Sequence, residues 1–294
     1  MADSVHIFRH HAMATFFEMR VAGGGDAYAG QAAQAAFAII DRTEMRLSRF
    51  LEGSEISQIN RLQPGEVLRV SVEVAACLAQ AIELQALTHG AFDPGLGGPP
   101  TALLQRVGDN AFHRGQLLID NESLLVGVEG GPVSLDLGAI GKGFALDLAA
   151  EELRDWELPR TLLNGGGSSL LSFTGPGAGL DKQWEIGIGG DRPTHRLFLE
   201  NNALGSSGTA VKGEHILDPD TGKPVPSGRR TWAIAPTAAA ADALSTAWMI
   251  LPLDEIETIC AERQGIGAIV QSDGKYWSTG LAPELHFGVK SRAS

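Results

Sequence analysis

Hydrophobic and polar positions along the chain follow two different spacings, one typical of helices and one typical of strands. Apolar residues recur with helical periodicity over residues 28–47, which predicts a long amphipathic helix. A second helix is expected over residues 72–88, closed by His89 and Gly90. Short apolar runs between turn residues predict strands at residues 16–21, 117–120, 124–128, 133–137, 161–163, 170–173, 184–188, 196–199, 231–235 and 265–271.

The order of these elements indicates the fold class. Residues 117–128 form a hairpin pattern across 121–123, and the helices are unevenly spaced between strands. Hairpins mixed with irregularly placed helices favour an α+β fold over a doubly wound parallel sheet. A chain of 294 residues can bury a large core, so we expect residues 1–294 to form one domain of two intimate lobes.

Composition and charge narrow the class of partner. Hydrophobic residues make up 44% of the chain and charged residues 20%, as in ordinary globular proteins. The formal net charge of −12 argues against a nucleic-acid partner, because phosphates would be repelled. Cys77 and Cys260 are far apart in apolar, helix-like settings, which predicts two buried thiols rather than a disulfide framework.

The N-terminal residues bear on localisation. Residues 1–6 show no basic patch followed by an apolar run, and no apolar stretch approaches 18 residues. We therefore expect a cytoplasmic protein with no membrane span, or an exported one if a leader has been removed.

The most informative segment is the glycine-rich run DLGAIGKGFALD at residues 136–147. It leads from the predicted strand at 133–137 through a turn into a helix pattern. Gly138, Gly141 and Gly143 allow close backbone approach, and Lys142 with the first helix amides suits a phosphate. The run matches neither a Walker loop nor a dinucleotide GxGxxG. A purely structural glycine-rich corner remains the alternative.

A second cluster is the run ADALSTAW at residues 241–248, which follows the predicted strand at 231–235. Asp242 and Thr246 are four residues apart and therefore share one face of a helix. A carboxylate and a hydroxyl on one face suit a hard cation such as Mg²⁺. Alternatively, Asp242 complements the helix dipole and Thr246 bonds back to a carbonyl.

These two clusters and five further segments resemble the ApbE-type flavin transferases, the FAD:protein FMN transferase family. The seven segments follow one another along the chain in the same order as in that family. The resemblance runs over nearly the whole chain. The further segments are MAT at 13–15, LSRF at 47–50 with SEISQIN at 54–60, GAFDP at 90–94, NGGG at 164–167 and HILDPDTG at 215–222.

The resemblance implies an α+β fold related to the T-fold and a specific reaction. In the family, the FMN half of FAD is transferred through a phosphodiester bond to a Thr or Ser hydroxyl of a partner flavoprotein, such as a redox subunit, and AMP is released. Mg²⁺ assists this phosphoryl transfer. Acceptors carry a motif resembling Asp-x-x-Ser/Thr-Gly-Ala-Thr. This chain contains no such run, so self-modification is not expected.

The resemblance also assigns roles to individual residues. It implies that Mg²⁺ is held by the Ala139 carbonyl, Asp242 and Thr246, with Ser245 adjacent. His215 becomes the candidate general base for the acceptor hydroxyl. Phe50 and Phe92 are expected to offer stacking surfaces. The flavin and adenosine contacts map to Met13, Phe50, Ala91, Phe92, Asp93, Asp136, Lys142 and Ile216.

Several residues depart from the family pattern. Ala14 replaces a glycine, Phe50 replaces a common tyrosine, and Ser168 stands where an acid is usual. Two alternative functions therefore stay open. One is an FAD pyrophosphatase that yields AMP and free FMN, and the other is a flavin-binding protein without turnover.

Overall fold

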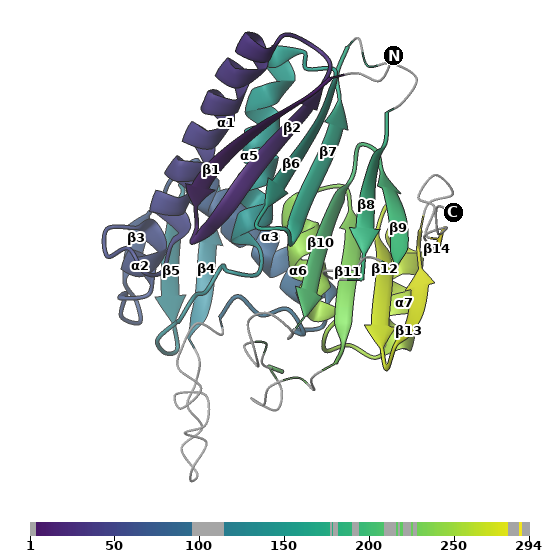
Figure 1. Cartoon of the computed structure of the whole chain (residues 1–294). Helices are drawn as coiled ribbons and strands as arrows, with labels where there is room; N and C mark the ends of the chain where they lie inside the picture. Colours follow the sequence, from purple (N-terminus) through teal and green to yellow (C-terminus); the bar gives the residue numbers. More distant parts are fainter. Residues whose placement is uncertain are drawn as a thin grey trace.

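The computed structural model describes residues 4–95, 115–176, 178, 182–189, 194–208, 216, 218–219, 225, 228–281 and 288–289. An eight-stranded antiparallel sheet lies between a layer of helices and a small three-stranded sheet (Figure 1). The predicted α+β class is confirmed, because helices and antiparallel strands are mixed and every paired strand runs antiparallel.

The two faces of the large sheet have different surroundings. Along β2, Phe17, Met19 and Val21 point to the helices, whereas Phe16 points away from them and is 64% exposed. This alternation is the two-residue period of a strand with one covered face. In spatial order the strands are β1 (Val5–Ala12), β2 (Thr15–Ala22), β6 (Arg160–Gly165), β7 (Ser169–Thr174), β10 (Ala203–Gly208), β11 (Arg230–Ala235), β12 (Gly267–Ser272) and β13 (Lys275–Thr279).

The helices cover one face of this sheet and form the main core with it (Figure 1). Small residues such as Ala32, Ala33 and Ala36 line the buried side of α1, so α1 and α5 pack closely. The helices are α1 (Asp26–Leu47), α2 (Glu55–Ile59), α3 (Val72–Leu87), α5 (Gly141–Leu153), α6 (Ala238–Ala247) and α7 (Leu253–Glu262), with a 3₁₀ turn at Arg154–Trp156.

The opposite face carries a second core. Trp184, Ile188, Leu197 and Leu199 pack there against outward residues of the large sheet. They belong to the three-stranded sheet of β8 (Trp184–Ile188), β9 (His195–Leu199) and β14 (Gly288–Val289). A separate three-stranded sheet, which contacts α3 through β4, contains β3 (Val67–Arg69), β4 (Gln116–Asp120) and β5 (Leu125–Glu129).

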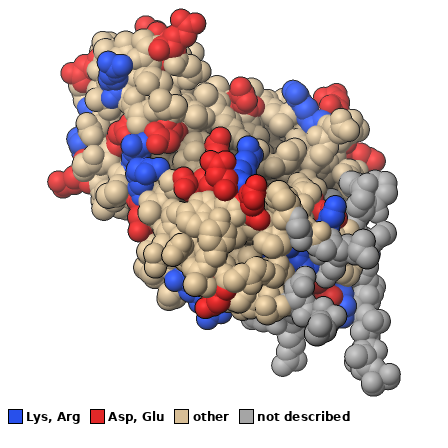
Figure 2. Space-filling model, turned by 90° about the horizontal axis from the view of Figure 1, so that it is seen from above, with Lys and Arg blue, Asp and Glu red and all other residues tan. Residues whose placement is uncertain are grey.

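The described surface carries charges of both signs, and the two cysteines are buried as the sequence predicted. On the side shown in Figure 2, acidic side chains lie among basic ones over the described residues. One ion pair between described residues joins Arg9 and Glu18, with 2.7 Å between Nε and Oε2. Both cysteine thiols are buried, and burial raises the pKa of Cys260 to about 12. Within the described ranges, none of the helices combines the length and apolar character needed to cross a bilayer.

One local prediction needs correction. Residues 133–137 do not form a strand. Instead, the side-chain amide of Asn60 bonds both the N–H and the carbonyl of Leu135, taking the place of a neighbouring strand. The helix predicted at 72–88 is confirmed as α3, and His89 and Gly90 close it as predicted, with His89 at a left-handed φ of 52°. Its N–H reaches the Ala86 carbonyl, and Gly90 follows with φ of 86°.

The β1–β2 turn contains strain that a single substitution should relieve. Met13 and Ala14 have φ of 50° and 56°, a conformation unfavourable for residues with a Cβ. Ala14→Gly is expected to raise the free energy of unfolding by about 1 kcal/mol in denaturant titrations. Ala12→Gly makes the same chemical change in the adjoining strand, where it should lower stability. Equal effects at both positions would contradict this explanation.

Candidate functional site

The candidate site forms where α5 and α6 cap one another. The first turn of α5 has no side-chain cap at Ile140. Instead, Asp242 of α6 accepts the Gly143 N–H at 2.9 Å through Oδ2. In return, Asp147 of α5 accepts the N–H groups of Ala238 and Ala239 at 2.7 and 2.9 Å. The two helices therefore supply each other with the acceptors that their N-termini need.

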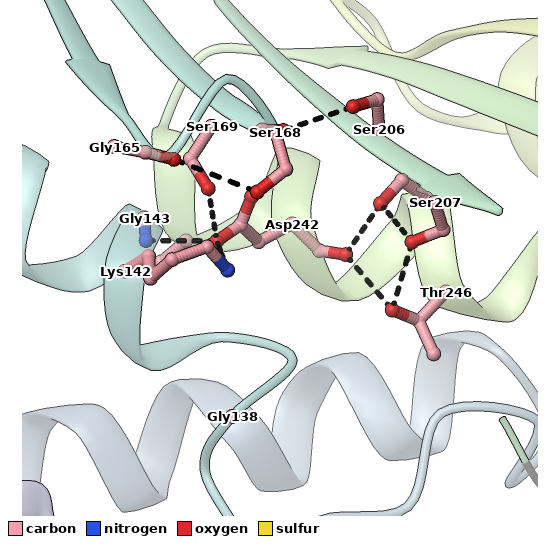
Figure 3. A network of polar contacts seen from close by, with 12 residues as sticks. Gly138, Lys142, Gly143, Gly165, Ser168, Ser169, Ser206, Ser207, Asp242 and Thr246 are labelled. Carbon is pink, nitrogen blue, oxygen red and sulfur yellow. Dashed lines mark hydrogen bonds and ion pairs between the residues drawn. The ribbon is translucent and has the colours of Figure 1, made fainter. Parts of the chain in front are cut away.

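The Asp242 carboxylate is the centre of this arrangement (Figure 3). Its residue is 4% exposed. Besides the Gly143 amide, Oδ2 accepts a hydrogen bond from Ser169 Oγ at 2.8 Å and lies 3.5 Å from Lys142 Nζ. Burial raises the pKa of Asp242, while Lys142, Ser169 and the Gly143 amide counteract that rise. Among the described residues, no donor reaches Oδ1.

Hydroxyl groups cluster one turn further along α6. Ser207 Oγ lies 2.8 Å from Ser245 Oγ and 3.3 Å from Thr246 Oγ1. Ser245 is buried and donates to the Asp242 carbonyl at 2.8 Å, while Thr246 reaches the same carbonyl at 3.4 Å. Figure 3 shows Lys142 and Gly143 on one side of Asp242, with Ser207 and Thr246 on the other. The predicted shared face of Asp242 and Thr246 is confirmed.

Glycines on both sides hold α6 against its neighbours. A Cβ at Gly143 would overlap the backbone carbonyl of Ala238, and a Cβ at Gly205 of β10 would overlap that of Ala241. Only glycine allows backbone to approach this closely. The position of α6, and therefore of Asp242, depends on both.

The donor set fits Mg²⁺ better than a softer metal. Within the described ranges, His, Cys, Asp and Glu do not gather in any group of three that could hold a metal ion. What is present is one buried carboxylate with hydroxyl oxygens nearby, from Thr246 and Ser207. Mg²⁺ is commonly bound by one or two carboxylates together with substrate phosphates. Ala139 lies in the turn just before α5, at residues 138–140.

A second group of predicted residues gathers around Arg49. Its Nε is 3.1 Å from Asp136 Oδ2, and its guanidinium lies over the Phe50 ring, 4.7 Å from the centroid. The Phe50 residue is 81% exposed. The Asp136 N–H bonds the Pro94 carbonyl, which joins this group to the segment that carries Asp93. Phe50, Asp93 and Asp136 are thus connected through their neighbours.

Other predicted residues have different surroundings. Phe92 is 2% exposed and belongs to the main core, so the prediction that it offers a stacking surface is wrong. Ala91 is also buried. Met13 lies at the β1–β2 turn, and Ile216 packs with Met249 just beyond α6. His215, the predicted base, lies outside the described residues.

Three contacting residues were missed from the sequence. Ser169 gave no signal, because a single serine in an apolar strand has no pattern. Ser207 lies in none of the segments that resemble the family. Asp147 closes the glycine-rich run, and an acidic residue there could have suggested a cap for a neighbouring helix.

Asp147 should make stability depend on pH in an unusual direction. Burial raises its pKa from 3.8 to about 6, despite the two amides that it accepts; the nearby Asp242 adds to the rise. Between these values the folded state holds a proton that the unfolded chain has released. The free energy of unfolding therefore falls as pH rises from about 4 to about 6.

The matched variant Asp147→Asn isolates this contribution. Relative to the variant, the wild type should lose on the order of 2–3 kcal/mol between pH 4 and pH 7, since each pKa unit corresponds to about 1.4 kcal/mol. Chemical denaturation of both proteins at pH 4, 5, 6 and 7 measures the difference. A difference that stays constant across this range would refute the assignment.

Comparisons with known proteins identify the family. Residues 13–270 match the ApbE family. The chain is 26% identical to the FAD:protein FMN transferase of Haemophilus influenzae, covering 81% of this chain and 78% of that protein. For the Klebsiella pneumoniae protein of the same name, the identity is 23% and the coverage 97% and 89%.

Solved structures give the same fold. The ApbE protein of Thermotoga maritima has a TM-score of 0.76 at 25% identity, covering 94% of this chain and 97% of that one. The flavinyl transferase ApbE of Pseudomonas stutzeri has a TM-score of 0.74 at 24% identity, with coverage of 95% and 96%. Because residues 13–270 match the ApbE family and thereby confirm the resemblance, this chain belongs to the ApbE family.

Proposed function

We propose that this protein transfers the FMN moiety of FAD, in a Mg²⁺-dependent reaction, to a Ser or Thr hydroxyl of a partner flavoprotein and releases AMP. The observation that carries the proposal is the Asp242 carboxylate, buried at the N-terminus of α5 beside Lys142. Membership of a family whose relatives are named FAD:protein FMN transferases supports the choice of substrate.

The chain's own groups suit a pyrophosphate. The side chain of Lys142 is 19% exposed, and its Nζ lies 3.5 Å from Asp242 Oδ2. The N-terminus of α5 adds partial positive charge at the same place. Together they would bind the phosphates of FAD and orient the bond to be broken.

We expect Mg²⁺ to be held by Asp242, the Thr246 hydroxyl and the Ala139 carbonyl. The adjacent Ser245 would stabilise this arrangement through its hydrogen bond to the Asp242 carbonyl. When bound, the ion supplies positive charge that stabilises the leaving AMP phosphate. The exposed Phe50 ring, held by Arg49, would offer a face to the flavin. His215 is proposed to accept the proton of the acceptor hydroxyl, on the resemblance alone.

One experiment distinguishes this function from its alternatives. The protein is incubated with FAD, Mg²⁺ and an acceptor domain carrying the Asp-x-x-Ser/Thr-Gly-Ala-Thr motif, and both AMP and flavin are quantified by chromatography. AMP together with protein-bound FMN supports the transferase. AMP with free FMN indicates a pyrophosphatase instead, and bound FAD without AMP indicates a binding protein. A parallel sample with EDTA tests the metal requirement.

A further inference from the structure

The two oxygens of the Asp242 carboxylate have different surroundings. Oδ2 receives three donors: the Gly143 amide of α5, the Ser169 hydroxyl of β7 and the Lys142 ammonium. Oδ1 receives none from the described residues. A carboxylate fixed through one oxygen keeps the other available for a ligand, and donors behind a metal-binding group commonly fix its orientation.

Ser169 is the only one of these donors that comes from the sheet, and the sheet is shaped around it. The strand register pairs Ser169 with Gly165 on one side and with Gly205 on the other. Neither neighbour has a side chain: the Phe17 ring lies against Gly165, and the backbone of α6 lies against Gly205. The absence of a side chain at Gly205 lets α6 approach the sheet there, which brings Asp242 within hydrogen-bond distance of the Ser169 hydroxyl.

Because the hydrogen bond between Ser169 and Asp242 is buried, losing it is costly. Ser169 is 0% exposed and Asp242 is 4% exposed. A buried hydrogen bond to an ionised carboxylate contributes more than an ordinary one, and removing one partner leaves the other unsatisfied. If Ser169 lost its hydroxyl, the Gly143 amide and Lys142, 3.5 Å away, would be the only described groups that restrain the carboxylate.

We propose that Ser169 is a positioning residue that holds Asp242 through Oδ2 and thereby sets the affinity of the site for its divalent cation. The inference rests on the proposed function for the identity of the cation, but it concerns binding rather than transfer. It assigns a role to a residue for which the family motifs give none.

The test measures metal affinity directly. Free Mn²⁺ is followed by electron paramagnetic resonance during titration of the wild type and of Ser169→Ala. The alanine variant is expected to bind Mn²⁺ about tenfold more weakly. Ser169→Thr keeps a hydroxyl and should recover affinity to within about threefold of the wild type. In turnover, the Mg²⁺ concentration for half-maximal rate should rise with kcat at saturating Mg²⁺ nearly unchanged.

Ser172→Ala is the matched control, because Ser172 is a buried serine on the same strand whose Oγ contacts only the Asn202 carbonyl, at 3.4 Å, among the described residues. It should change stability without changing Mn²⁺ affinity. If Ser169→Ala does not fold, Ser169→Cys replaces it, since a thiol of similar size is a weaker donor. Wild-type Mn²⁺ affinity in a folded Ser169→Ala or Ser169→Cys protein would overturn the proposal.

Failure of the proposed function gives a different result. A wild type that binds Mn²⁺ but transfers no FMN would refute the transferase, while a weakened Ser169→Ala would still support the role of Ser169. A wild type that binds no Mn²⁺ would overturn the role of Ser169 itself.

Discussion

Asp242→Ala is expected to abolish Mg²⁺-dependent AMP release from FAD, with a loss of at least about 100-fold. The substitution removes the only carboxylate among the proposed cation ligands. It also removes the acceptor of the Gly143 amide and of the Ser169 hydroxyl. The free energy of unfolding should therefore fall by about 1–3 kcal/mol, the cost of leaving buried donors unsatisfied.

Two measurements separate the catalytic effect from the structural one. AMP is quantified at a temperature where denaturation curves show the variant to be fully folded, and FAD binding is followed by flavin fluorescence. Asp254→Ala, an exposed aspartate on α7, is the control and should leave both unchanged. Normal AMP release from a folded Asp242→Ala protein would remove this residue from the cation site.

Gly143→Ala should have the largest effect on stability, lowering the free energy of unfolding by about 3 kcal/mol or more. The new Cβ would overlap the backbone of Ala238 and Ala239, which cannot move aside as a flexible side chain could. Separating α5 from α6 would also withdraw the Gly143 amide from Asp242. We therefore expect weaker Mn²⁺ binding as well.

Gly53→Ala is the matched control, since a Cβ at that position meets no atom within 4 Å. Urea titration of both variants measures the contrast. If the two substitutions cost the same, the close contact between α5 and α6 does not determine stability. If Gly143→Ala alone lowers the free energy of unfolding, glycine is required there by the contact with the α6 backbone and not by the turn that precedes α5.

The sequence predicted best where a repeating pattern or a run of motif residues was available. Helical periodicity located α1 and α3, and the four-residue spacing in α6 put Asp242 and Thr246 on one face. The glycine-rich run led correctly into α5. These features are local, so neighbouring residues carry the information that they need.

Features that depend on distant residues could not be predicted. The extended segment around Leu135 has the apolar pattern of a strand, but its partner is the side chain of Asn60, 75 residues away in sequence. Phe92 has the same aromatic ring whether it faces a ligand or the core, and only packing decides between them. The role of Ser169 depends on the strand register that pairs it with Gly165 and Gly205, and the sequence does not give that register.

The mutual capping of α5 and α6 has a consequence for motion. Releasing the first turn of α6 would leave Asp147 buried without its two amide donors, and releasing α5 would take the Gly143 amide away from Asp242. Neither helix can fray alone at low energetic cost, so the N-terminal turns of α5 and α6 should open and close as one cooperative unit. Under the proposed function, such all-or-none behaviour would keep water from reaching a bound dinucleotide through small, frequent local fluctuations.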